Sequence, residues 1–116
     1  MKRQKLLSLE ESPKVVIATL HAKRLYLQYT DQFKAEMEEQ LRYIQANFII
    51  DFSGVNIINS LAIGVLIASA NTVRNKHKKF IIVGLNPYLR EIFKRMRLDL
   101  ILEIKKDLQE GMTLLK

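Results

Sequence analysis

Few residues in this sequence have the types and spacing that catalysis or metal binding would need. The chain has no cysteine, which excludes disulfides, thiolate metal sites and a thiol nucleophile. Its two histidines, His21 and His77, stand at no metal-ligand spacing from each other or from a pair of carboxylates. The glycines are too dispersed for a phosphate-binding loop, and no serine lies in a nucleophile elbow. A triad assembled from distant residues stays open, but we expect no catalytic residue, no metal and no cofactor, and therefore a binding protein rather than an enzyme.

One residue, Ser60, is well placed for a chemical modification. It follows Asn59 at the junction between an apolar strand and an apolar helix. The first amides of a helix are unpaired and carry about half a positive charge, so a phosphoryl group on Ser60 would be stabilised there. The simpler interpretation, which the local sequence favours, is that Asn59 or Ser60 only caps the helix.

Composition predicts one small globular domain. The chain has 116 residues, of which 48% are hydrophobic, so it can bury a core but leaves little room for a second domain. Its net charge of +7 favours acidic partners. The densest basic run, residues 74–79, lacks the aromatic residues that stack on single-stranded nucleic acid. We expect a solvated loop there and no direct nucleic-acid contact. Binding of a small ligand or of anionic lipid through this run is an alternative that charge alone supports.

No segment has the pattern of an export signal or a membrane span. Glu10 and Glu11 interrupt the basic start of the chain before any apolar stretch forms. The longest apolar run, residues 61–70, is much shorter than a membrane span. We therefore expect a cytoplasmic protein without stable membrane insertion, a monomer or weak dimer, with residues 1–4 disordered.

Apolar periodicity predicts four helices. In the first, apolar residues recur at steps of three and four from Phe33 to Ile44, Thr30 or Asp31 would cap the start, and charged residues such as Glu36 occupy the other faces. Gly64, inside the second, suggests close packing against a strand. The other three helices are expected to begin near Ser60, at Asn86-Pro87 and at Asp107.

Apolar and β-branched runs predict five strands between these helices. They cover residues 5–10, 14–20, 48–52, 80–84 and 100–104. Residues 21–27 are ambiguous between loop and strand, and residues 55–58 read as a link. Because most strands alternate with helices, the sequence predicts an α/β fold: one domain over residues 1–116, with a mixed, mostly parallel sheet of about five strands and four helices.

Three stretches carry a family resemblance. Residues 48–67 form a strand ending in Asp-Phe-Ser-Gly-Val, a short link and a helix opened by Asn-Ser-Leu-Ala-Ile-Gly. Residues 80–93 form a strand, an Asn-Pro turn and a helix, and residues 107–111 open a closing acidic helix. These stretches resemble the STAS domain family, in particular the bacterial anti-sigma factor antagonists, whose patterns are Asp-Leu-Ser-Gly-Val and Asp-Ser-Ser-Gly-Leu-Gly.

The resemblance implies partner switching. An antagonist of this family binds an anti-sigma factor that is also a serine kinase, is phosphorylated by it and released, and is restored by a phosphatase. Ser60 aligns with the phosphoacceptor. The partner-binding positions implied around it are Asn59, Leu61, Ala62, Ile63 and Tyr26.

The sequence departs from the family pattern near Ser60. Asn59 stands in place of Asp, Leu61 in place of the second Ser and Ala62 in place of Gly, and Tyr26 takes the place of another Asp. Fewer acids would repel a phosphate less, and the more apolar helix start suits a constitutive contact. The alternative is therefore a STAS scaffold that works without phosphorylation, in a signalling assembly or a lipid-transport ATPase complex.

Overall fold

The structure, a computed structural model, describes residues 4–116. Most of the segment expected to be disordered, residues 1–3, lies outside the described residues. Gln4 is described, and its backbone oxygen accepts a hydrogen bond from the side-chain amide of Gln32 at 2.6 Å. The start of the described chain is thus held against the first helix.

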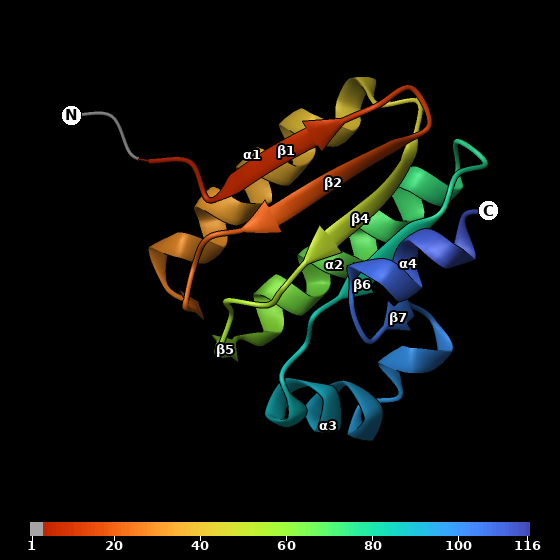
Figure 1. The fold of residues 1–116 in the computed structure, drawn as a ribbon. Coiled ribbons are helices and arrows are strands. Elements are labelled where there is room, and N and C mark those ends of the chain that lie inside the picture. Colours follow the sequence, from red (N-terminus) through yellow and green to blue (C-terminus); the bar gives the residue numbers. More distant parts are fainter. Residues whose placement is uncertain (1–3) are drawn as a thin grey trace.

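A five-stranded sheet in the order β1-β2-β4-β6-β7 forms the centre of the molecule (Figure 1). β1 is antiparallel to β2, and the other neighbours are parallel. This confirms the predicted mixed, mostly parallel sheet. The strands are β1 (Leu7–Glu11), β2 (Val15–Leu20), β4 (Asn47–Asp51), β6 (Phe80–Val83) and β7 (Glu103–Lys105).

Helices cover both faces of this sheet. In Figure 1, α1 and α2 lie side by side behind it, α4 crosses its front and α3 lies beyond one end. The four helices confirm the predicted α/β class. They are α1 (Gln28–Tyr43), α2 (Ser60–Arg74), α3 (Pro87–Arg95) and α4 (Leu108–Leu114).

The central strands are buried on both faces, which explains their continuous apolar runs. Phe48 and Phe80 point to the α1 and α2 side, where their rings stack with centroids 5.6 Å apart. Ile49 and Ile81 point to the opposite side and form a smaller core with α4. α4 approaches closely at Gly111, because a Cβ there would lie 3.0 Å from Val83 Cγ1.

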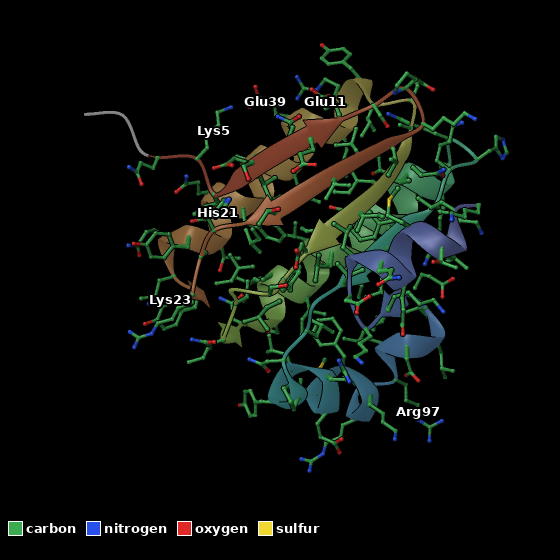
Figure 2. The ribbon with its side chains drawn as sticks, in the orientation of Figure 1. Lys5, Glu11, His21, Lys23, Glu39 and Arg97 are labelled. Carbon is green, nitrogen blue, oxygen red and sulfur yellow. The ribbon has the colours of Figure 1, made fainter. Side chains whose placement is uncertain are left out.

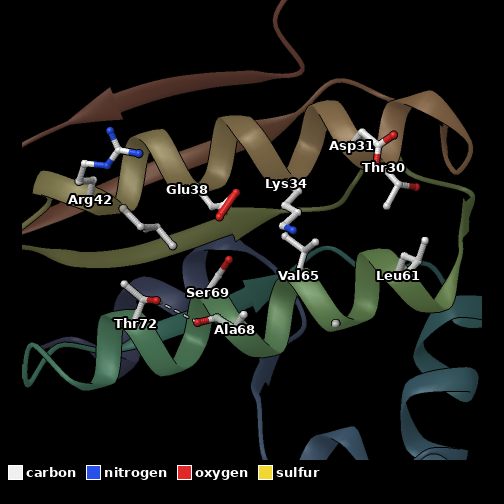
Figure 3. Close-up of a pocket in the computed structure, with 12 residues that line it drawn as sticks. Thr30, Asp31, Lys34, Glu38, Arg42, Leu61, Val65, Ala68, Ser69 and Thr72 are labelled. Carbon is white, nitrogen blue, oxygen red and sulfur yellow. Dashed lines mark hydrogen bonds between the residues drawn. The ribbon is translucent and has the colours of Figure 1, made fainter.

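The ambiguous segment and the predicted link pair with each other. β3 (Arg24–Leu25) and β5 (Ile57–Ile58) form a separate two-stranded parallel sheet. Neither piece is long enough to show periodicity in the sequence. This small sheet ties the chain before α1 to the chain before α2, so the two helices start at the same end of the molecule (Figure 3).

The predicted cap of the first helix is wrong. The helix begins at Gln28, so Thr30 and Asp31 lie inside its first turn, and no side chain caps it. Backbone oxygens supply the acceptors instead, because Tyr29 N donates to Tyr26 O and Thr30 N to Leu27 O. Leu27 makes this early start possible by taking φ 53° and ψ −136°.

Glu36 does not lie on a solvated face as the sequence predicted. It is buried, and its two carboxylate oxygens accept hydrogen bonds from the backbone amides of Leu6 and Leu7 and from the side-chain amide of Gln32. The carboxylate therefore satisfies backbone groups where the chain enters β1. The pattern of the helix alone does not predict this burial, because the two backbone donors lie some thirty residues away in the sequence.

Two other local predictions need correction. Residues 100–104 were expected as a strand, but a 3-10 helix covers Leu98–Leu100 and β7 begins only at Glu103. The left-handed Arg97, with φ 57°, turns the chain into the 3-10 helix. Gly64 packs against no strand: it is exposed, and a Cβ there would meet nothing within 4 Å.

Candidate functional site

The candidate site lies at the start of α2, beside the small β3–β5 sheet. Asn59 is the N-cap, and its side-chain oxygen accepts from Ala62 N at 2.9 Å. Its own backbone N donates to Leu25 O at 3.1 Å, which fixes it against β3. Of the two predicted caps, Asn59 is therefore correct and Ser60 is wrong.

Ser60 is the first residue of α2, and it is exposed. Within residues 4–116 its hydroxyl makes no hydrogen bond, so capping does not occupy it. The first turn of α2 contains no acidic residue. A phosphate on this hydroxyl would thus meet the positive end of a helix without a neighbouring carboxylate in that turn. The arrangement suits addition of a negative group to Ser60.

Exposed apolar side chains stand near Ser60 on three segments, and together they are called the apolar rim. Leu61 and Leu27 are each 69% exposed, and Ile57 is 44% exposed. The pairing of Leu25 with Ile58 brings these segments to one end of the molecule. Single exposed apolar residues are common, but a gathered set is typical of a protein contact.

Leu27 holds its exposed side chain on an unusual backbone. Its φ of 53° with ψ of −136° lies outside the regions that a side chain with Cβ normally occupies. Sequence reasoning missed Leu27 and Ile57, because each is an isolated apolar residue in a short unpatterned segment. Only the β3–β5 pairing reveals that they accompany Leu61.

The structure divides the predicted partner-binding residues. Asn59 and Tyr26 are partly buried at the site, and Leu61 is exposed. Ala62 has no exposed surface and Ile63 is only 6% exposed, so their prediction as contact residues is wrong. Both belong to the stripe of α2 that faces the core, because a helix that presents residue 61 outward turns the next two inward.

Positive charge is spread over more than one part of the surface. Lys5 and Lys23 lie on one side of the molecule, where they line the same hollow, and Arg97 lies on the opposite side (Figure 2). In the basic run, His77 is exposed as expected for a solvated loop. Lys76, however, donates to the backbone oxygens of Leu41 (2.6 Å) and Ile44 (2.9 Å) at the end of α1. It satisfies helix-end carbonyls and so is not a free charge for a lipid surface.

Residues 4–116 contain no group of three or more His, Asp or Glu side chains that could hold a metal ion. Across the same residues, no helix has the length and apolar character needed to cross a bilayer.

Comparison with known proteins agrees with the motifs. The STAS domain model matches residues 7–111. Among curated protein sequences no significant match was found. The family match confirms the resemblance proposed from the sequence.

Solved structures share the whole architecture. An anti-sigma-factor antagonist (STAS) domain protein from Planctomyces limnophilus is 17% identical, with a TM-score of 0.83 over 95% of this chain and 97% of that one. A variant of RsbS from Moorella thermoacetica is 20% identical, with a TM-score of 0.74 over 94% and 93%. The Bacillus cell fate determinant SpoIIAA in its phosphorylated form is 15% identical, with a TM-score of 0.68 over 95% and 99%. At such low identities, these similarities show a common fold.

Proposed function

Since this chain belongs to the STAS domain family, we propose that it is an anti-sigma factor antagonist in a partner-switching system. In this proposal it binds an anti-sigma factor that is also a serine kinase, the kinase phosphorylates Ser60, and a phosphatase reverses the modification. The whole chain acts as one cytoplasmic binding domain and needs no catalytic group of its own. The single observation that carries the proposal is the exposed Ser60 hydroxyl, which capping leaves unused.

The proposed switch follows from opposite effects of one phosphate. On the free chain, a group of charge about −1.5 to −2 at the first helical position is stabilised by the α2 dipole. In a complex that covers the apolar rim, the same group would lose water next to Leu61. Phosphorylation therefore favours the free chain over the complex. The phosphorylated form solved for SpoIIAA supports the proposal by family likeness.

The partner contact is proposed to centre on the apolar rim. Leu61 and Leu27 offer large exposed aliphatic side chains that a partner can bury. Asn59 contributes to this contact indirectly, because its hydrogen bond to Ala62 N fixes the first turn of α2. Asn59 also carries no charge where the family has Asp, which lowers the repulsion that a phosphate on Ser60 would meet.

The experiment uses the full chain and a serine kinase encoded nearby in the genome. Intact-mass analysis after incubation with the kinase and ATP should show one added phosphate, which Ser60→Ala abolishes. Ser60→Asp should weaken binding to the kinase, measured by calorimetry. Asn71→Asp is the matched control, since it adds one negative charge to an exposed position on the same helix and should leave binding unchanged. No phosphate on Ser60, or equal binding by Ser60→Asp and the wild type, would refute the switch.

A second candidate function has its own observation. The 69% exposure of Leu61, at a position where the family has a small polar residue, suits a contact that is never switched off. The chain would then be a scaffold in a signalling or lipid-transport ATPase complex. Co-purification with an ATPase that persists in Ser60→Asp and is lost in Leu61→Asp would favour the scaffold over the switch.

A further inference from the structure

A groove of about 620 Å³ separates α1 from α2 along their exposed sides (Figure 3). Its two walls differ in character. The α2 wall carries small side chains, because Gly64, Ala68 and Thr72 follow one another at intervals of four residues. Leu61 lies at the end near the start of the helix. The small side chains of this wall therefore allow another helix to approach the backbone of α2 closely.

The α1 wall carries charges of alternating sign. Along one face of the helix lie Asp31, Lys34, Glu38 and Arg42, all exposed and all lining the groove. At 100° per residue they fall within about a quarter of the helix circumference. In Figure 3, Lys34 reaches from α1 toward Val65 of α2. The groove is thus bordered by a single stripe that reads negative, positive, negative, positive.

These four charges have no ion-pair partner within the described part of the chain. The two ion pairs found there join Arg95 to Glu91 and Lys105 to Glu103. Arg42 makes one further contact, with its guanidinium carbon 6.0 Å from the centre of the Tyr43 ring. Attraction between neighbours along the helix contributes only about 0.2–0.5 kcal/mol per pair. The stripe is therefore available to charges from outside the chain.

The order of the charges makes the stripe complementary to itself when reversed. If a second α1 runs antiparallel across the stripe, Asp31 faces the second copy's Arg42, and Lys34 faces the second copy's Glu38. Both pairs share one two-fold axis near residues 36 and 37, so each pair occurs twice. A parallel arrangement in register would instead place like charges opposite each other. We propose that a second copy of this chain docks here, with α1 of each copy lying over the groove of the other.

Size and charge set the strength of this homodimer. α1 has 16 residues and is about 24 Å long, so two such helices in facing grooves bury an area at the low end for specific interfaces. The net charge of +7 on each copy opposes association, but it is screened beyond about 8 Å at physiological salt, whereas the facing pairs are close. The dimer is weak and forms at high protein concentration.

Two charge reversals test the proposal on the full chain by sedimentation equilibrium up to millimolar concentration. Asp31→Lys and Arg42→Glu each turn two attractive contacts of the dimer into repulsive ones, so each should weaken self-association by about ten-fold or more. An equimolar mixture of the two variants should restore association, because the new ammonium of one chain faces the new carboxylate of the other. The double variant should restore it as well.

The controls separate docking from folding. Glu39→Lys makes the same change of charge at an exposed α1 residue that does not line the groove, and it should leave self-association unchanged. Circular dichroism checks that each variant is folded, since Asp31 and Arg42 also complement the α1 dipole. A wild-type chain that stays monomeric at millimolar concentration would overturn the proposal. So would a mixture that associates no better than its components, or a loss in Glu39→Lys equal to that in Asp31→Lys.

Discussion

Replacing the two residues at the start of α2 separates the structural role from the chemical one. Asn59→Ala removes the 2.9 Å hydrogen bond to Ala62 N and leaves that amide without its acceptor. Loss of such a cap costs about 1 kcal/mol, within a range of about 0.5–2 kcal/mol. Ser60→Ala removes no hydrogen bond and introduces a better helix former. We expect its free energy of unfolding to stay within about 0.5 kcal/mol of the wild type.

Urea unfolding followed by circular dichroism measures both changes. The slope m should stay constant, so the shift in midpoint gives the change in free energy directly. A loss of 1 kcal/mol lowers the Tm of a 60–100-residue domain by about 4–8 °C, and a 116-residue chain should fall near the lower value. Asn86→Ala gives an upper reference, because Asn86 caps α3 by accepting from Leu89 N at 2.7 Å and its side-chain amide also donates to Val55 O at 3.3 Å.

The outcome that refutes this reasoning is a reversal of the two effects. If Ser60→Ala costs about 1 kcal/mol while Asn59→Ala costs nothing, the hydroxyl caps the helix and is not free for modification. Asn59→Asp adds a further check, because it keeps the acceptor oxygen and adds a charge that the helix dipole favours. It should be at least as stable as the wild type, with a gain of about 0.3–1 kcal/mol at low salt.

Two further substitutions test the buried polar and turn contacts. Glu36→Gln replaces one accepting oxygen by an amide group that faces other donors, so it should lower the free energy of unfolding by about 1–3 kcal/mol. Glu39→Gln, at an exposed position of the same helix, should leave that free energy unchanged. Equal urea midpoints for the two variants would contradict the buried contact of Glu36. Gly84→Ala should lower the Tm strongly, because φ is 80° and the added Cβ would lie 2.6 Å from an oxygen of Asp51. Gly54→Ala meets only one atom at 3.9 Å and serves as the tolerated control, so similar losses in both would refute the argument.

Local sequence information was sufficient for most of the fold and for the centre of the candidate site. The strands that contain Phe48 and Phe80 could be predicted from their apolar runs, because both faces of each strand are buried. Asn86 and Asn59 were identifiable as caps because a cap bonds to an amide only three residues away. Ser60 was identified as a candidate for modification by its place between an apolar strand and an apolar helix.

Other features depended on pairing between distant segments, and only the tertiary structure decided them. Burial of Glu36 needs amide donors from the start of β1, and the tie of Lys76 to the end of α1 spans more than thirty residues. Leu27 joins the apolar rim because β3 pairs with β5, two short strands without a visible period.

The candidate site shows the same division. The sequence by itself limited the cap of α2 to Asn59 or Ser60, because a cap contact is local, and the family resemblance made Ser60 the predicted site of modification. The structure then assigned the cap to Asn59. The tertiary structure decided which neighbours of Ser60 are exposed. In the structure, the side chains of Ala62 and Ile63 face the core, and those of Leu61 and Leu27 are exposed at the surface. Exposure depends on what packs against each side chain, and that packing comes from residues far away in the chain.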